Sequence, residues 1–225
     1  MPARRGGQQR IPRPPSAQVM GPPPWADLPR ERRRFSLAEI RARLADLPPG
    51  RAPIALVSEP REAAVLIPMF ERDGEARIIF IKRPETMPTH KGEIAFPGGG
   101  MDPEDDDLRA TALREAWEEI GLPPDDVEIV SQLDGLGTVG SRFTIVPFVG
   151  FLPEPPVLAP SPREVVRVLE VPISELLDPD VFREEHWPTR LAELQIFFYE
   201  MEDETIWGAT ARILTGFLAH LVEGR

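Results

Sequence analysis

The sequence predicts an α/β fold in which helices pack on a mixed β-sheet. Several short apolar runs rich in Val, Ile and Phe are typical of strands. Two segments have apolar residues at helical spacing, one in the middle of the chain (107–120) and one near its end (210–223). Because the predicted strands and helices do not alternate strictly, a mixed sheet is favoured over a purely parallel one.

Length, composition and charge limit the function classes. The chain has 225 residues, of which 41% are hydrophobic, so it can form one sizeable core. No apolar run approaches the ~20 residues that a membrane span needs, and we expect no membrane partner. The absence of cysteine excludes disulfides and thiolate metal sites and fits the cytoplasm. A net charge of −11 argues against a polynucleotide partner but leaves room for a local basic pocket. The oligomeric state is open, and a homodimer is compatible with the sequence.

The chain divides into two regions. Residues 1–34 are rich in Pro, Gly and Arg and have no apolar period, so we expect a disordered tail. The Arg-rich, acid-poor start also suits an organellar transit peptide, although Pro and Gly oppose the helix that such a peptide needs. Residues 35–225 are expected to form the single folded domain.

The elements of this domain follow from local patterns. Ser36 and Glu39 have the spacing of a capping box, which predicts a helix over 36–47. Two apolar runs, 63–70 and 76–83, are expected to pair as strands across a turn at 72–74. Residues 86–100 are expected to be a loop. The remaining patterns predict a short helix at 173–178 and strands at 127–133, 143–152, 164–172 and 194–201.

The helix predicted at 107–120 has two distinct faces. Each helical residue advances the direction of the side chain by about 100°. One stripe is apolar and is expected to face the core, and it consists of Leu113, Ala116, Trp117 and Ile120. A second arc, roughly 100° wide, is acidic and consists of Glu115, Glu118 and Glu119. Gly121 follows the last apolar residue and suits a C-cap.

The acidic arc favours a metal site over a merely solvated face, which is the ordinary interpretation of a charge run. Like charges at these spacings destabilise a helix by about 0.2–0.5 kcal/mol per pair. Closely spaced oxygen ligands suit Mg²⁺ or Mn²⁺ (magnesium or manganese), ions that also bridge phosphates. Gly98, Gly99 and Gly100 directly precede the helix, and glycine lets the backbone approach a phosphate closely.

These residues resemble the signature of the Nudix hydrolases, G-x5-E-x7-R-E-U-x-E-E-x-G-U, where U is a bulky apolar residue. The corresponding segment runs from Gly100 to Leu122, with Asp106 at the first Glu and the small Ala116 at the first U. The resemblance implies an α/β/α sandwich with a mixed sheet. It also implies an enzyme, a pyrophosphohydrolase that cleaves a small-molecule nucleoside diphosphate derivative.

The same resemblance implies the roles of the charged residues. Glu115, Glu118 and Glu119 are expected to hold the divalent metal, and Arg114 is expected to orient them through ion pairs. The base that takes the proton of the attacking water varies across the family. Glu115 and Glu164 both stay open for this role, and a plain exposed acid at the start of a strand is the alternative for Glu164.

A narrower resemblance points to a substrate. Residues 78–100 resemble the coenzyme A diphosphatase branch of the family, whose pattern is roughly L-L-T-x-R-[SA]-x3-R-x3-G-x3-F-P-G-G. Arg83, Gly92 and the segment 96–99 match this pattern. Pro84 and Pro88 depart from it, because a small residue and a second Arg are expected there.

The branch resemblance implies hydrolysis of coenzyme A or acyl-coenzyme A to 3′,5′-ADP and (acyl-)phosphopantetheine. A broader hydrolase of ADP-ribose, dinucleoside polyphosphates or nucleoside triphosphates is the alternative, and a non-catalytic nucleotide-binding module is a third. Basic residues cluster just before the glycines at Lys82, Arg83, His90 and Lys91. The residues expected to bind substrate are Arg83, Lys91, Gly98, Gly99 and Gly100, with ordinary solvent exposure as the alternative for Lys91.

Overall fold

The computed structural model describes residues 6–7, 9, 11–48, 50–55, 58–87, 90–138, 142–188 and 193–223. Its helices are α1 (Leu37–Leu44), α2 (Leu108–Ile120), α3 (Ile173–Leu176) and α4 (Gly208–Glu223), with short 3-10 turns η1 (Arg30–Arg32) and η2 (Pro124–Asp126). Among the described residues, no helix is both long and apolar enough to cross a membrane.

The larger of two sheets is mixed, as the sequence predicts. Its central order is β4-β3-β2-β8-β6, where β2 and β8 run parallel and the other neighbours run antiparallel. Three further strands extend this order, since β5 pairs with β2, β7 with β8 and β9 with β3. The strands are β2 (Arg61–Arg72), β3 (Glu75–Lys82), β4 (Ile94–Ala95), β5 (Gly98–Gly100), β6 (Glu128–Gln132), β7 (Leu136–Gly137), β8 (Phe143–Phe151) and β9 (Arg167–Pro172).

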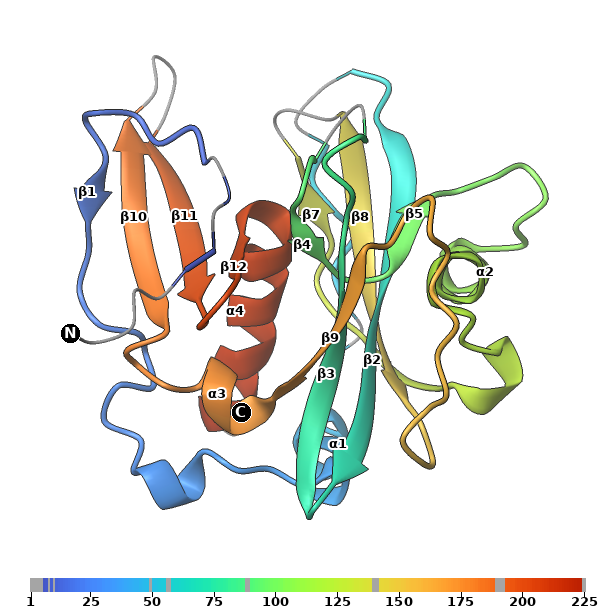
Figure 1. Cartoon of the computed structure of the whole chain (residues 1–225), viewed down its shortest axis with the longest axis horizontal. Helices are drawn as coiled ribbons and strands as arrows, with labels where there is room; N and C mark the ends of the chain where they lie inside the picture. The colour runs from blue at the N-terminus through green and yellow to red at the C-terminus, as the bar shows by residue number, and fades with distance from the viewer. Residues whose placement is uncertain are drawn as a thin grey trace.

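The smaller sheet has the order β1-β10-β11-β12 and is antiparallel throughout. Its strands are β1 (Gln18–Val19), β10 (Phe182–Pro188), β11 (Glu193–Glu200) and β12 (Thr205–Trp207). Helix α4 stands between the two sheets (Figure 1) and contacts β11 and β12. On the opposite side of the larger sheet lies α2, so the sheet is covered on both faces (Figure 1).

Strand β2 shows how the two faces are filled. Side chains alternate between the faces of a strand. Ala64 and Leu66 belong to the apolar cluster under α2, whereas Ile67 and Met69 belong to the cluster shared with α1 and α4. Since all four are buried, β2 is a central strand with two apolar faces, and the predicted α/β/α arrangement is confirmed.

The predicted helix caps and the predicted turn, which depend on a few neighbouring residues, are confirmed. Ser36 and Glu39 form both bonds of the capping box on α1. The β2–β3 turn places Asp73 and Gly74 at φ of 56° and 71°, the left-handed region that this dipeptide tolerates. Helix α2 begins after Asp107, whose carboxylate accepts from the backbone N–H of Ala110 at 2.7 Å. It ends at Gly121 with φ of 67°.

Several expectations are wrong. The segment 86–100 contains β4 and β5 in addition to loop, and the strand predicted from residue 164 begins only at Arg167. The highly charged strand β10 was not expected from its sequence. Trp117, placed in the core stripe of α2, is 53% exposed. The buried face of α2 is instead rotated toward Thr111, Ala112 and Glu119, and the inward-facing Glu119 accepts a hydrogen bond from the backbone of β5.

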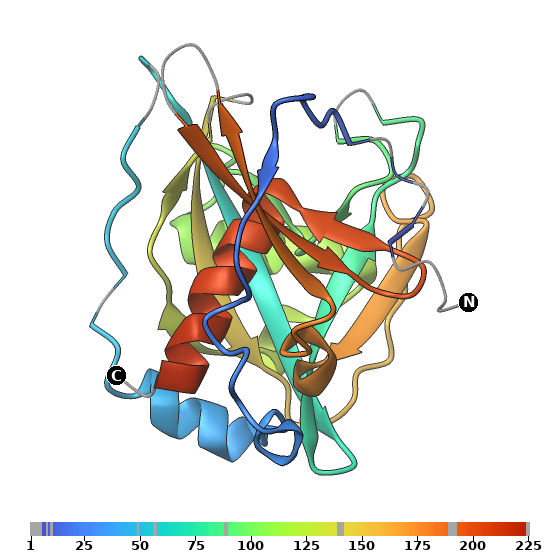
Figure 2. The same cartoon turned by 90° about the vertical axis from the view of Figure 1, so that its left-hand side faces the viewer.

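The N-terminal segment also differs from the expected disordered tail. It runs along the smaller sheet (Figure 2), where β1 pairs with β10. Trp25 is 1% exposed and its ring meets that of Phe182 edge-on at 5.2 Å. The large apolar surface of one tryptophan anchors a segment that otherwise lacks an apolar pattern. The division of the chain at residue 34 stays a prediction.

Candidate active site

Strand β5 packs directly against the acidic residues of α2. The backbone N–H of Gly98 donates to Glu119 Oε2 at 3.0 Å. A Cβ on Gly99 would lie 2.5 Å from Glu115 Cδ, closer than real atoms come. Any larger residue at this position would displace the Glu115 carboxylate, so glycine lets the backbone and this carboxylate meet as they do. Two of the predicted site glycines thus contact two of the predicted metal ligands.

Arg114 connects the same strand to the other acids. Its Nη2 donates to the Gly100 carbonyl at 3.1 Å, and its Nε donates to Asp105 Oδ1 at 2.8 Å. Its Nη1 lies 3.0 Å from Glu115 Oε1 and 3.2 Å from Glu118 Oε2. One guanidinium thus fixes the loop before α2, the last glycine of β5 and two carboxylates of α2 in a single arrangement.

Asp105, and not Asp106, is the acidic partner of Arg114. Besides Arg114, the Asp105 carboxylate accepts from Thr111 Oγ1 at 2.8 Å and from the backbone N–H of Asp102 at 3.0 Å. The Arg114 guanidinium holds the pKa of Asp105 well below its usual range. Asp106, which occupies the first acidic position of the signature by sequence spacing, is exposed.

Glu119 is the most unusual carboxylate of the site. Its side chain is only 2% exposed. Burial raises its pKa to about 8, although the N–H of Gly98 and the charge of Arg83 oppose the shift. Arg83 Nη1 lies 3.6 Å from Glu119 Oε1. A carboxylate that is costly to ionise while buried is suited to bind a cation, which restores the favourable charge.

Glu164 lies near these acids although it is far from them in sequence. It lies in a turn that hydrogen-bonds to the end of α2, since the N–H of Ser161 donates to the Glu119 carbonyl at 2.8 Å. The negative charge of Glu164 contributes to raising the pKa of both Glu115 and Glu119. Burial is the larger cause for Glu115, whose carboxylate is partly stabilised by Arg114. Glu164 therefore lies within electrostatic range of both acids.

The donor set fits a hard divalent cation in its chemistry. Glu115, Glu118 and Glu119 offer only carboxylate oxygens, the ligands that Mg²⁺ and Mn²⁺ prefer. In the part of the chain that the structure describes, no three acidic side chains converge closely enough to hold an ion as they stand. Arg114 Nη1 forms ion pairs with both Glu115 and Glu118 in this arrangement.

The predicted basic cluster is largely neutralised by local partners. Three of its cations each face a carboxylate: Lys82 with Glu204 at 2.6 Å, Arg83 with Glu119 at 3.6 Å and His90 with Glu93 at 2.8 Å. Lys91 is exposed and has no ion pair with a described residue. Pro88, the departure from the branch pattern, lies outside the described residues.

Arg61 was not singled out from the sequence. Its guanidinium lies over the ring of Phe143 at 5.1 Å, and a Cβ on Gly100 would be 3.9 Å from its Nη2. Together with Asp105 it lines a hollow of about 360 Å³ beside β5. The local sequence around Arg61 does not predict that it lies beside β5, because this placement depends on the pairing of β2 with β5 and β8.

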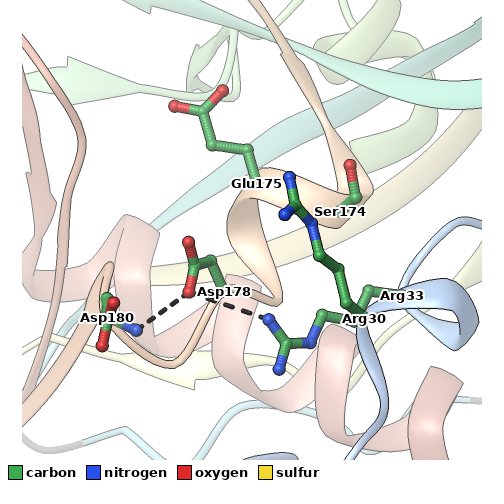
Figure 3. Close-up of a pocket in the computed structure, with 6 residues that line it drawn as sticks. All are labelled: Arg30, Arg33, Ser174, Glu175, Asp178 and Asp180. Atoms are coloured by element: carbon green, nitrogen blue, oxygen red, sulfur yellow. Dashed lines mark hydrogen bonds and ion pairs between the residues drawn. The ribbon is translucent and has the colours of Figure 1, made fainter.

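A second hollow of about 500 Å³ lies between η1 and α3 (Figure 3). Its charged lining includes an ion pair between Arg33 Nη1 and Asp178 Oδ1 at 3.7 Å. It shares no residue with the α2 site and contains none of the predicted site residues.

The comparisons with protein families and with known proteins agree on one family. The NUDIX domain model matches residues 60–191. The Nudix hydrolase NudL of Photorhabdus laumondii is 37% identical over 168 residues, which cover 75% of this chain and 88% of that protein. The chloroplastic Nudix hydrolase 22 of Arabidopsis thaliana is 38% identical over 162 residues, covering 69% of this chain and 53% of that protein.

One solved structure supports the fold alone. A MutT/nudix family protein from Enterococcus faecalis superposes with a TM-score of 0.50 at 15% identity, covering 86% of this chain and 72% of that one. The domain match spans more than half of the 225 residues and includes β5, α2 and Glu164. The chain belongs to the Nudix hydrolase family of pyrophosphohydrolases.

Proposed function

We propose that this Nudix hydrolase cleaves the diphosphate bond of coenzyme A or acyl-coenzyme A with the help of Mg²⁺ or Mn²⁺. The products are 3′,5′-ADP and (acyl-)phosphopantetheine. The observation that carries the reaction class is the contact of β5 with Glu115 and Glu119, because it places a glycine backbone suited to phosphate beside carboxylates suited to a cation.

In this proposal Glu115, Glu118 and Glu119 hold the divalent cation. When bound, such an ion neutralises diphosphate charge and lowers the pKa of a coordinated water. Arg114 keeps the carboxylates at the correct spacing through its bonds to Asp105 and Gly100. The buried Glu119 gives up its proton when the cation site is filled, and its bond from Gly98 then keeps β5 in place.

Glu164 is our first candidate for the base that takes the proton from the attacking water, with Glu115 as the alternative. Its charge acts on both Glu115 and Glu119, which supports this role. Unlike Glu115, it forms no ion pair with a described residue. A Glu164→Gln variant is expected to lose turnover and keep cation affinity, whereas loss of both would favour a ligand role.

Coenzyme A is proposed from the match of Arg83, Gly92 and the segment 96–99 to the branch pattern. The broader alternative, which includes ADP-ribose and dinucleoside polyphosphates, is favoured by Pro88 and by the engagement of Arg83 with Glu119. Replacing Pro88 by Arg is expected to raise turnover of coenzyme A selectively. An unchanged preference would count against a role of this position in substrate choice.

The reaction class is tested by product analysis of Glu118→Gln. Glu118 is 52% exposed and bonds only to Arg114 among the described residues, so its replacement should leave the fold intact. We expect loss of metal-dependent hydrolysis, as EDTA causes in the native protein, while Glu104→Gln on the neighbouring exposed loop stays active. Activity retained in Glu118→Gln would refute the metal assignment. A cytoplasmic location stays a prediction, and the plant relative is named as chloroplastic.

A further inference from the structure

The side-chain amide of Gln9 bridges two backbone segments that are far apart in the sequence. Its Nε2 donates to the Gly92 carbonyl at 2.9 Å. Its Oε1 accepts from the backbone N–H of Thr205, in β12, at 3.1 Å. Only one orientation of the amide satisfies both bonds, because one partner is an acceptor and the other a donor. Gln9 therefore connects the turn around Gly92 to the smaller sheet.

The turn 90–93 is held closely at this point. Gly92 is buried with φ of 62°, and a Cβ there would lie 2.1 Å from Glu85 Oε1. The turn returns to the start of its own loop, where the N–H of Arg83 donates to the Glu93 carbonyl at 3.0 Å. Lys91, the exposed cation of the predicted substrate site, directly precedes the carbonyl that Gln9 binds.

Gln9 is itself well supported by the N-terminal segment. The N–H of Gly6 donates to the Met201 carbonyl at 2.7 Å, and a Cβ on Gly7 would lie 2.4 Å from the carbonyl oxygen of Asp203. Farther along, Arg13 Nε bonds both carboxylate oxygens of the buried Glu185 at 2.8 Å. The segment is thus fixed on either side of Gln9, and its amide has a defined position from which to hold the turn.

We propose that Gln9 is a positioning residue that holds the turn 90–93, and with it Lys91, in the arrangement that binds the substrate. This inference rests on the proposed function and on the expectation from the sequence that Lys91 binds the substrate. Gln9 lies too early in the chain to fall within the matched domain, which begins at residue 60. It acts on binding rather than on the chemical step, because neither of its bonds involves α2.

The test compares Gln9→Glu with a matched change on the same segment. In Gln9→Glu the carboxylate still accepts from Thr205 but cannot donate to Gly92. Gln18→Glu makes the same chemical change at an exposed residue whose side chain has no bond with a described residue. Hydrogen exchange of the backbone amides of the turn 90–93, measured without substrate, shows directly whether Gln9 stabilises the turn. Steady-state kinetics then show whether the loss of this hydrogen bond weakens substrate binding.

We expect Gln9→Glu to speed exchange in the turn and to raise KM about three- to tenfold, the factor that the loss of one hydrogen bond corresponds to. The value of kcat should stay within about twofold, and Gln18→Glu should behave as the native protein. Unchanged exchange, or faster exchange with an unchanged KM, would overturn the role of Gln9. A native protein that hydrolyses no diphosphate would overturn the proposed function instead, whatever the exchange shows, so the two failures are distinguishable.

Discussion

The backbone N–H of Gly98 donates to the Glu119 carboxylate at 3.0 Å, and the Glu119 side chain is only 2% exposed. This bond ties the first glycine of β5 to the last acid of α2. It explains why three glycines and three glutamates occur together in a short stretch of sequence. The glycines bring the backbone against the helix, and the glutamates need that backbone and Arg114 to remain close to one another.

The close approach of Gly99 to Glu115 predicts that alanine substitutions at Gly99 and Gly100 have very different effects on activity. Gly99→Ala should displace the Glu115 carboxylate, because the new Cβ would lie 2.5 Å from its Cδ. A displacement of that kind can reduce kcat/KM about 100-fold. Gly100→Ala is the matched control, since its Cβ meets nothing nearer than 3.7 Å. Steady-state kinetics decide the prediction, and equal activity of the two variants would contradict it.

The raised pKa of Glu119 predicts a pH dependence of stability in the metal-free protein. Between the ordinary carboxyl pKa and about 8, the folded state holds a proton that the unfolded chain has lost. Stability should therefore fall as the pH rises through this window, by up to about 1.4 kcal/mol for each unit of pKa shift. Denaturant unfolding at pH 5 and pH 8, in EDTA, measures the change.

Glu119→Gln is the control for that measurement, because a neutral amide does not titrate. Its stability should change less between pH 5 and pH 8 than that of the native protein. Adding Mg²⁺ or Mn²⁺ at pH 8 should restore stability to the native protein and not to the variant. An equal pH dependence in both proteins would mean that another group is responsible.

The pairing of Arg114 with Asp105 predicts different outcomes for two adjacent acids. Asp105→Asn weakens bonds to a charged partner, which should lower the free energy of unfolding by about 1.5–3 kcal/mol. Because the pKa of Asp105 is lowered in the fold, this stability is present at neutral pH and is lost as the pH falls. Asp106→Asn, at an exposed residue, should change little. Equal effects at pH 7 would contradict the assignment of Asp105 as the partner of Arg114.

Trp25 should contribute strongly to stability if the N-terminal segment packs as described. Trp25→Ala removes a buried ring in contact with Phe182, and we expect a loss of about 3–5 kcal/mol. Val19→Ala, on the same segment but 60% exposed, should cost less than about 0.5 kcal/mol. Thermal or denaturant unfolding compares them, and a small effect of Trp25→Ala would support the disordered tail that composition predicts.

Local chemistry made part of this structure predictable. The boundaries of α2 follow from Asp107 and Gly121, and the β2–β3 hairpin follows from Asp73 and Gly74. Such features depend on a few consecutive residues. The clustering of acids on α2 was predictable for the same reason.

Features that depend on partners elsewhere in the chain were not predictable. Strand β5 consists of glycines, which are poor strand formers, and it exists because β2 pairs with it. Strand β10 buries Glu185, which needs Arg13 and Arg183 as partners. The buried face of α2, with Trp117 outward and Glu119 inward, still follows helical spacing, but it includes the polar residues Thr111 and Glu119, which a search for apolar residues misses.

The most direct test of the central claim is the ratio of kcat/KM for coenzyme A to that for dephospho-coenzyme A, measured with Mg²⁺ or Mn²⁺ and checked with EDTA. The two substrates share the diphosphate that the α2 site would cleave and differ in one phosphate group. We predict a clear preference for coenzyme A, with 3′,5′-ADP as a product. Equal or better turnover of the dephospho form, or of ADP-ribose, would contradict the coenzyme A assignment.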